Sequence, residues 1–399
     1  MKILFLTNKS PYPPIDGGSI ATFGMMKGLT NAGHKVTALV MNTLKHHITP
    51  FEIPEQVASK ITFHLVEVPA NIQFIPAIKN LLFSDLPYNA ERFITKKYSN
   101  KLESLLKVNH FDIIQLEGLY LYPYIEVIRK HSKAKIVYRG HNIEFEIWER
   151  LLVNSSGLKK LYLKILVNRL KIFEKAMINQ YDLLIPITER DLIKLNKLGN
   201  KKPALVIPAG INLEEAQNNI QQKFDNLFFI GALDWAPNQE GLVWFLDKCW
   251  NKLLKNFPNL QLTIAGRNAP SWLVNKFKKK NITYAGEVPD AKDYMLNQGI
   301  MIAPLFSGSG MRVKIIEAMN LKKPIVTTTI GCEGIDINHK VHAMIGDTPS
   351  LFINNITHLL QQEQLAHSIS ENCFTFVQSN YSNQNIAKRL INFYNKHTT

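Results

Sequence analysis

Short apolar runs alternate with amphipathic stretches along the chain, and this alternation predicts an α/β fold. The apolar run MKILFLTN opens the sequence. A loop with three prolines and two glycines follows, then a helical pattern over residues 19–32, and then a second apolar run, HKVTALVM. Strand, helix and strand in this order are typical of a βαβ unit, which places its strands in a parallel sheet.

The same pattern continues to about residue 210 and then restarts after a polar stretch at residues 212–222. The first series of expected strands continues with ITFHLVEV, FDIIQLEG, AKIVYRGH, YDLLIPIT and PALVIPAG, and the second series comprises NLFFIGAL, LQLTIAGR, NITYAGEV, GIMIAPLF and KPIVTTTI. We therefore predict two doubly wound, Rossmann-like domains. Ligands of such sheets bind beyond the carboxyl ends of the strands, so the expected site is a cleft between the domains.

The composition is that of a globular protein without membrane spans. Of the 399 residues, 46% are hydrophobic and 20% are charged, and no apolar run approaches the roughly 18 residues needed to cross a bilayer. The first apolar run is too short for a signal peptide, because Asn8 and Lys9 interrupt it. The three cysteines are far apart, with no disulfide or metal spacing, which favours a reducing compartment. We expect a cytoplasmic protein.

The formal net charge of +15 points to an anionic partner, which would be nucleic acid, a membrane surface or a small substrate. The chain has no recognised nucleic-acid module and no arginine-rich tract, so nucleic acid is not expected. Residues 158–178 form an amphipathic basic pattern. A core-facing helix with a solvated basic face is the favoured interpretation. Docking on acidic lipid at the inner face of a membrane is the alternative.

The stretch FSGSGMRVKIIEAM follows an apolar run and is expected to form a loop and the first turns of a helix. Exposed N–H groups and the positive end of the helix dipole attract anions at such a position. Gly308 and Gly310 would let a ligand approach the backbone closely. Arg312 and Lys314 add positive charge, and an acid three residues after Lys314 could accept hydrogen bonds from hydroxyls. A nucleoside diphosphate would use all of these groups.

Ordinary structural explanations of this stretch remain open at this point. Gly-Ser-Gly after a strand is common in α/β proteins. The stretch lacks the dinucleotide fingerprint, since Val313 stands where the third glycine belongs, and it is not a P-loop. A Lys–Glu pair three residues apart is usually a surface pair worth a few tenths of a kcal/mol. The residues alone favour ligand binding and a plain turn equally.

At these residues the sequence resembles the retaining glycosyltransferases of family 4, which have the GT-B fold. The resemblance covers nearly the whole chain and is carried by GGSIATFGMMKGLTNAGHKV, RGHNIEFEIW, FIGALDWAPNQEGLVWFL, LTIAGR, GEVPD, APLFSGSGMRVKIIEAM and KPIVTTTIGCEGI. It implies two facing Rossmann-like domains: an N-terminal acceptor domain of residues 1–208 and a C-terminal donor domain of residues 223–381. It also implies that a last helix, residues 382–399, crosses back onto the N-terminal domain.

The resemblance assigns roles to several residues. Glu317 matches the second acid of the family's acid-x7-acid motif, which binds ribose hydroxyls, but Ser309 stands where the first acid would be. The loop GALDWAPNQEG lacks the Arg and Lys that grip the diphosphate in related sequences, so we infer that Arg312 and Lys314 supply this charge. His141 follows an expected strand and matches the family histidine near the sugar, although a lone histidine is more often structural.

The remaining contacts are implied in the same way. The glycines after the first strand match the family's N-domain glycine loop, and the alternative for them is a plain turn. Asn142 and Glu144 could cap the helix that follows. The implied donor-binding set is Gly17, Gly18, Gly231, Val288, Ser309, Gly310, Met311, Glu317 and Glu333, and the implied catalytic set is His141, Arg312 and Lys314.

We therefore expect an enzyme that moves a sugar from a nucleoside-diphosphate sugar to a glycan or lipid-linked acceptor, in bacterial surface polysaccharide or glycolipid assembly. The chain has no Asp-x-Asp motif, so neither a metal nor another cofactor is predicted. A metal-independent nucleotide-sugar epimerase and a non-catalytic nucleotide-sugar binding subunit are the alternatives. NIQFIPAIKNLLF could meet a lipid-linked acceptor, but a buried helix is slightly favoured.

Overall fold

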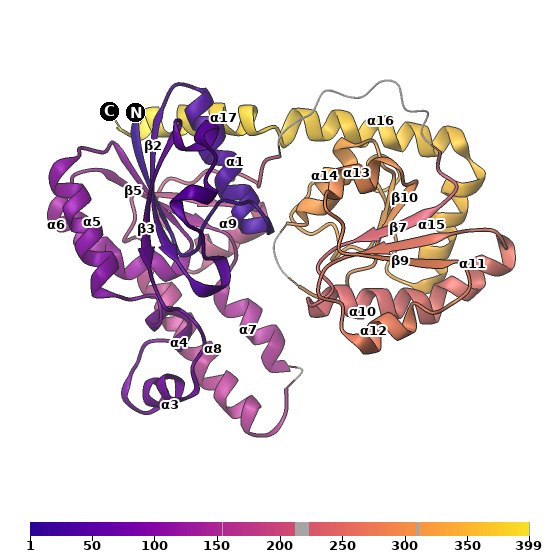
Figure 1. The fold of residues 1–399 in the computed structure, drawn as a ribbon, viewed down its shortest axis with the longest axis horizontal. Coiled ribbons are helices and arrows are strands. Elements are labelled where there is room, and N and C mark those ends of the chain that lie inside the picture. The colour runs from indigo at the N-terminus through magenta and orange to yellow at the C-terminus, as the bar shows by residue number, and fades with distance from the viewer. Residues whose placement is uncertain (154, 212–222, 309–310, 399) are drawn as a thin grey trace. The chain divides into compact units, whose positions relative to one another are not determined.

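The computed structural model describes residues 1–153, 155–211, 223–308 and 311–398 (Figure 1). The chain divides into an N-terminal unit of residues 1–210 and 383–399 and a C-terminal unit of residues 211–382. The polar stretch 212–222 and the predicted site residues Ser309 and Gly310 lie outside the described residues.

The N-terminal unit contains a parallel sheet of six strands in the order β3-β2-β1-β4-β5-β6. Its strands are β1 (Lys2–Thr7), β2 (Lys35–Asn42), β3 (Ile61–Glu67), β4 (Ile113–Glu117), β5 (Lys135–Gly140) and β6 (Leu183–Pro186). The order reverses between β1 and β4, which are paired from Ile3–Ile113 to Thr7–Glu117. This is the strand order of a Rossmann fold, and it places the loops after β1 and β4 beside each other.

One predicted strand of this unit is absent as a regular strand. PALVIPAG runs beside β6, and its Leu205 and Ile207 donate backbone hydrogen bonds to Leu184 and Pro186 at 3.0 Å each. Pro186 has no N–H to donate in return, and the segment forms only an isolated bridge through Ala204.

Helices cover both faces of this sheet. They are α1 (Gly17–Asn31), α2 (Glu55–Ala58), α3 (Phe74–Phe83), α4 (Tyr88–Glu91), α5 (Lys96–Val108), α6 (Ile125–His131), α7 (Glu144–Val153), α8 (Gly157–Met177), α9 (Glu189–Lys197) and α17 (Asn383–Thr398), with short 3-10 turns at Leu44–His46, Pro50–Glu52 and Leu119–Tyr124. One core cluster joins the sheet to α5, α6 and α8, and another joins its other face to α1 and α17.

Helix α1 begins at Gly17, two residues before the predicted start. The carboxylate of Asp16 accepts a hydrogen bond from the backbone N–H of Ser19, and the Ser19 hydroxyl accepts one from the N–H of Asp16. This reciprocal capping box extends the helix toward its N-terminus. Gly17 and Gly18 therefore lie in the first turn of α1, and not in the loop before it.

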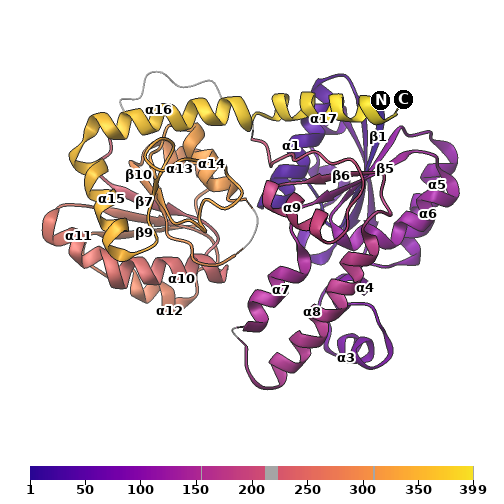
Figure 2. The same ribbon diagram turned by 180° about the vertical axis from the view of Figure 1, so that it is seen from behind.

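Helix α17 packs on a glycine face of α1 in the N-terminal unit, as the predicted crossing helix requires (Figure 2). Gly24 and Gly28 lie on the same face of α1. A Cβ atom added at Gly28 would come within 2.8 Å of the carbonyl oxygen of Asn383 and 3.0 Å of the Ala387 Cβ. The absence of side chains at both glycines lets the two helices approach closely.

The C-terminal unit repeats the same strand order, β12-β11-β10-β7-β8-β9, in a parallel sheet. Its strands are β7 (Leu227–Ile230), β8 (Leu262–Ala265), β9 (Ile282–Gly286), β10 (Ile300–Ala303), β11 (Ile325–Thr327) and β12 (Met344–Ile345). All five apolar runs predicted for this half form strands. The two-residue strand β12 was not predicted, because so short a run gives no apolar pattern.

The helices of this unit are α10 (Ala236–Phe245), α11 (Asn251–Asn256), α12 (Ser271–Lys276), α13 (Ala291–Leu296), α14 (Val313–Asn320), α15 (Pro349–Gln361) and α16 (Glu363–Asn380). A π-helical turn, Leu246–Trp250, joins α10 to α11. The core packs α10, α11, α15 and α16 against the sheet around the fully buried Trp250. All three cysteines carry free thiols.

A glycine of α10 sets how closely this helix approaches the end of β10. A Cβ atom added at Gly241 would lie 1.8 Å from the carbonyl oxygen of Pro304, the residue that follows β10. Backbone cannot yield as a flexible side chain would, so the helix or the strand end would have to move.

We predict that Gly241→Ala lowers the free energy of unfolding of the C-terminal unit by about 3 kcal/mol, since the overpacking outweighs the better helix propensity of alanine. Equilibrium unfolding in urea would measure it. Lys252→Ala, at an exposed position of α11, is the control and should change this free energy little. An unchanged midpoint in Gly241→Ala would contradict the close approach.

Candidate functional site

The strand order reverses between β7 and β10 of the C-terminal unit, so the loops that follow these strands lie beside each other. Gly231 opens the loop after β7, and residues 304–312 follow β10. Such a reversal point is where open α/β sheets bind ligands. The loop after β11, which carries Glu333, is next to the loop after β10 because β10 pairs with β11.

Arg312 is held at the start of α14 by the loop after β7. It is the N-cap residue of α14 and is only 8% exposed, and its guanidinium carbon lies 5.5 Å from the ring centroid of Trp235. A cation over an indole ring is a favourable contact. The same ring explains one glycine: Gly308 has φ of +100°, and a Cβ atom there would lie 2.9 Å from Trp235. Trp235 therefore shapes the loop and positions the guanidinium.

One turn into α14, Lys314 and Glu317 form an ion pair. Their Nζ and Oε2 atoms are 2.8 Å apart, and the side chains are 37% and 25% exposed. Both side chains are partly exposed at the start of the helix, although the Oε2 atom of Glu317 is itself buried. Because the pair is partly exposed, it contributes little to stability.

The other predicted donor contacts lie on the same edge of this sheet or at its far end. Met311 is half-buried and directly precedes Arg312, and Glu333 is half-buried in the loop after β11. Val288 follows β9, which is separated from β7 by β8. The strand order thus brings Gly231, Met311, Arg312 and Glu333 to neighbouring strand ends and leaves Val288 at the edge of the sheet.

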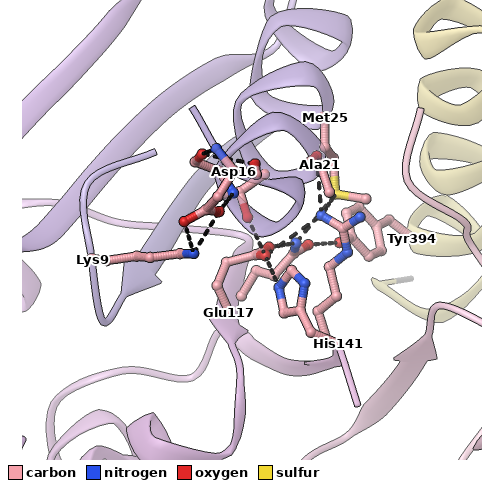
Figure 3. Close-up of polar contacts among 11 residues, drawn as sticks. Lys9, Asp16, Ala21, Met25, Glu117, His141 and Tyr394 are labelled. Carbon is pink, nitrogen blue, oxygen red and sulfur yellow. Dashed lines mark hydrogen bonds and ion pairs between the residues drawn. The ribbon is translucent and has the colours of Figure 1, made fainter. Parts of the chain in front are cut away.

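In the N-terminal unit, a buried carboxylate organises the equivalent reversal point (Figure 3). Glu117 ends β4 and is 4% exposed. Its Oε2 lies 2.7 Å from His141 Nε2, accepts a hydrogen bond from the Thr22 hydroxyl at 2.8 Å, and is 3.5 Å from the Arg139 guanidinium. Gln115 donates to the other oxygen of the same carboxylate.

Burial alone would raise the pKa of Glu117. The positive charge of Arg139 and hydrogen bonds from His141 and Gln115 outweigh it and lower the pKa to about 2. Glu117 is therefore an anion, and an acceptor only, at neutral pH.

His141 follows β5 and is 19% exposed. Desolvation lowers the pKa of His141 and outweighs the opposite effect of Glu117, with Arg139 and Lys9 lowering the pKa further. The imidazole is thus neutral at pH 7, and its proton lies on Nε2, since the carboxylate it contacts can only accept. Nδ1 keeps its lone pair and can accept a hydrogen bond from a sugar hydroxyl.

One contact connects this network to the last helix of the chain, and a separate ion pair lies at the start of the first helix. Tyr394 of α17 donates to Gln115, which in turn holds Glu117. At the start of α1, Lys9 Nζ lies 2.6 Å from Asp16 Oδ1. A Cβ atom on Gly18 would come within 3.0 Å of the same Nζ, so the glycine leaves room for the lysine beside the helix start.

The helix that follows His141 is capped from a distance. Glu174 of α8 accepts hydrogen bonds at 3.2 Å from the backbone N–H groups of Glu144 and Phe145, the first residues of α7. Burial and the nearby Glu144 raise the pKa of Glu174 to about 8. Of the two residues that could have capped this helix, Asn142 and Glu144, the side chain of Glu144 accepts a hydrogen bond from Tyr120 at 2.8 Å instead.

The sequence interpretation missed Glu117, Arg139 and Gln115. A usable signal was present: FDIIQLEG and AKIVYRGH carry polar residues inside apolar runs, at the carboxyl ends of adjacent strands. In an α/β sheet, such residues are buried and must be paired. Across the described residues, no three His, Cys, Asp or Glu side chains gather closely enough to hold a metal ion.

Residues 225–362 match the family described as Glycosyl transferases group 1. The matched residues make up most of the C-terminal unit. The whole chain is 26% identical, over 96% of its length and 97% of the other protein, to a Klebsiella pneumoniae protein described as "Uncharacterized 44.6 kDa protein in cps region".

Solved structures similar to this chain show its fold. Alr3699/HepE of Anabaena, in complex with UDP, is 15% identical with a TM-score of 0.69 and covers 99% of this chain and 100% of its own. S. aureus TarM, in complex with fondaparinux, alpha-GlcNAc-glycerol and UDP, is 10% identical with a TM-score of 0.70 and the same coverage. The predicted GT-B fold, with two Rossmann-like domains, is confirmed.

We predict that Glu117→Gln is less stable than the wild type at pH 7 and that the difference shrinks in acid. The folded-state pKa of Glu117 is about 2 and the ordinary value is 4.5. The stabilisation is therefore complete above pH 4.5 and is lost as the pH falls toward 2. It amounts to roughly 3 kcal/mol.

Urea unfolding at several pH values between about 7 and 3 would measure this difference. Glu126→Gln replaces an exposed carboxylate of α6 and should leave the pH profile unchanged. A Glu117→Gln profile parallel to that of the wild type over this range would contradict the assignment.

Proposed function

We propose that the chain transfers a sugar from a nucleoside-diphosphate sugar to an acceptor hydroxyl with retention of anomeric configuration. One observation carries the proposal. In a unit that matches glycosyl transferases group 1, Arg312 is fixed against Trp235 at the strand reversal point, two residues before Lys314 of the partly exposed Lys314–Glu317 pair. A buried cation, a helix start and an accessible acid are the groups that a diphosphate and a ribose require.

The donor binds with its diphosphate at the start of α14. Arg312 and Lys314 face the phosphate oxygens, and Glu317 accepts hydrogen bonds from the ribose hydroxyls. Without donor, Lys314 and Glu317 neutralise each other at 2.8 Å. Donor binding exchanges this ion pair for charge-assisted bonds to phosphate and hydroxyl groups, which are stronger than neutral ones. Gly231, Met311 and Glu333 complete the surroundings of the donor, and Ser309 and Gly310 belong to the same stretch.

The N-terminal unit contributes His141 to the transferred sugar. Its Nδ1 accepts a hydrogen bond from a sugar hydroxyl, and Glu117 holds the ring through Nε2 at 2.7 Å. Gly17 and Gly18 let the donor approach the first turn of α1, where the backbone N–H groups point outward.

In the transfer step, the bond from the anomeric carbon to the phosphate oxygen breaks and the acceptor oxygen attacks from the same face. The acceptor proton passes to the leaving phosphate oxygen, so no protein nucleophile is needed. Arg312, Lys314 and the start of α14 stabilise the negative charge on the leaving diphosphate. Preorganised groups of this kind contribute several kcal/mol to the transition state. We assign no metal and no other cofactor to this step.

The comparisons support a uridine nucleotide and a polysaccharide pathway. The Anabaena protein was crystallised with UDP-glucose as well as UDP, and the S. aureus protein with UDP and a glycan. The Klebsiella relative lies in a cps region. We therefore propose UDP-sugars as first donors to test, a glycan or lipid-linked acceptor, and a cytoplasmic role in bacterial surface polysaccharide assembly.

We predict that Lys314→Ala lowers kcat/KM by about 100-fold, because the leaving diphosphate loses a positive partner, and that Glu317→Ala abolishes turnover of the donor. A UDP-sugar turnover assay with released UDP as the readout would measure both. Retention of fold is checked by thermal unfolding, since the pair is partly exposed.

Glu371→Ala is the matched control for this pair. Glu371 forms an ion pair with Lys322 at 2.7 Å, just beyond the C-terminal end of α14 and so at the opposite end from Arg312, and should not affect turnover. Wild-type rates in both α14 variants would refute the site. A sugar that changes configuration without acceptor would instead identify an epimerase, and tight donor binding without any transfer would identify a binding subunit.

We predict that His141→Ala lowers kcat at least 10-fold while the Kd for UDP changes less than twofold, because His141 acts on the sugar and not on the nucleotide. Calorimetry with UDP and steady-state kinetics would separate the two effects. His110→Ala, at an exposed position, is the control. A weakened Kd for UDP with unchanged kcat would contradict the role given to His141.

A further inference from the structure

Exposed apolar side chains gather on one projecting part of the N-terminal unit. They lie on α3, on the end of α7 and on the beginning of α8: Phe74, Ile75, Ile78, Leu82, Phe83, Leu151, Val153, Leu158 and Leu161. We call this set the projecting surface. Phe74 is 80% exposed, Phe83 85% and Leu158 87%. Exposed apolar side chains gathered in this way mark an interaction site.

The slightly favoured burial of NIQFIPAIKNLLF is wrong. Residues 74–83 do form a helix, α3, but its outer face carries two phenylalanines and several aliphatic side chains in solvent. The apolar periodicity predicted the helix correctly, but the expectation that its apolar face packs against the core was wrong.

Polar contacts, and not apolar packing, attach α3 to the rest of the unit. Arg169 of α8 donates to the carbonyl oxygens of Asn80 and Leu81 at 3.1 and 3.0 Å, in the last turn of α3. The Asn80 side chain is buried and donates to Glu91 at 2.8 Å. Asn80 is the one buried residue of α3, so most of the apolar side chains of this helix face solvent, unlike those of a core-facing helix.

Figures 1 and 2 show α3, α4 and the α7–α8 hairpin extending beyond the sheet of this unit in the same direction. Arg169 contacts α3 eleven residues after Leu158, so α3 lies about 16 Å along α8 from the tip of the hairpin. The apolar side chains of both therefore belong to one projection.

The stretch that leads from the end of α7 into α8 carries positive charge, whereas an exposed acid, Asp85, follows α3. Between Arg150 and Lys164 the chain has four basic residues and no acidic one. Lys159, Lys160 and Lys164 are exposed, and they interleave with the exposed Leu158 and Leu161. Among the described residues, no helix is both long and apolar enough to cross a bilayer.

We propose that the projecting surface docks on a bilayer of anionic lipids, with the apolar face of α3 and the hairpin tip in the headgroup region and the three lysines against the phosphates. Apolar side chains interleaved with lysine are the pattern of interfacial helices. A protein partner of stable affinity would bring acidic side chains in fixed positions. Lipid phosphates, in contrast, can move to match any arrangement of lysines. Apolar side chains and basic residues together give stable membrane attachment.

The test is sedimentation of the full-length protein with vesicles. Vesicles of equal parts phosphatidylglycerol and phosphatidylcholine should bind the wild type at least 10-fold more tightly than phosphatidylcholine alone. Raising the salt from about 0.1 M to about 1 M should weaken this binding. Lys159→Gln, Lys160→Gln and Lys164→Gln together should lower the affinity by about 100-fold, since each basic residue near an anionic surface contributes about 1 kcal/mol.

Phe74→Ser with Phe83→Ser should lower the affinity for the anionic vesicles at least 10-fold, because each phenylalanine loses apolar burial. Phe51→Ser is the matched control, since Phe51 is 98% exposed and lies outside the projecting surface. Lys96→Gln, Lys97→Gln and Lys133→Gln together are the control for charge. Both controls should bind within twofold of the wild type.

Three results would overturn the proposal. The wild type could fail to bind anionic vesicles, the patch variants could bind as well as their controls, or the chain could form a dimer that the Phe74 and Phe83 changes dissociate without any vesicle binding. The last result would assign the surface to a second copy of this chain. The lysine variants leave α3 intact and keep the test valid if the double phenylalanine variant fails to fold.

Discussion

The carboxylate of Glu117 is the constraint on which the N-terminal unit depends. A charge this deeply buried is tolerated only if it is paired and hydrogen-bonded, and four elements supply its partners: α1 through Thr22, β5 through Arg139, the loop after β5 through His141, and α17 through Tyr394 and Gln115. These partners come from both ends of the chain. The same contacts that satisfy the charge hold the imidazole in one tautomer, so stability and the readiness of His141 for a hydroxyl have a common origin.

The C-terminal unit arranges the charged groups at its strand reversal point differently. Both sheets reverse their strand order at one point, yet the N-terminal unit fills that point with a buried ionic network, and the C-terminal unit keeps its charges where a ligand can reach them. Arg312 is largely buried there, and the aromatic ring of Trp235 supports its guanidinium. The loop after β7, which has neither Arg nor Lys, therefore contributes to the site through Trp235.

Much of the fold could be predicted from local sequence patterns. The site could be predicted only where its residues are close together in the sequence. Apolar runs give the strands of both sheets because parallel strands are buried on both faces. The start of α14 with Arg312, Lys314 and Glu317 is contiguous in sequence and was predictable for that reason. Glu117, Arg139 and Tyr394 were not, since their meaning lies in contacts between segments 22 to 279 residues apart. PALVIPAG failed as a strand because the proline that blocks its ladder is in the neighbouring strand.

The helix α3 and the N-terminal cap of α7 both show that a local sequence pattern does not predict which element a helix contacts. In α7, a helix start that looked able to cap itself is capped by Glu174, which lies about thirty residues further along the chain. In α3, an apolar face that looked ready for a core is turned outward, because Arg169 binds the carbonyl groups of its last turn. Both partners lie on α8, the basic helix whose composition suggested either a core or a lipid surface. The structure gives it both roles along its length: its second half packs on the sheet, and its first turns carry exposed lysines and leucines. Periodicity determines which side chains share a face, but only the neighbouring element determines whether that face meets protein or solvent.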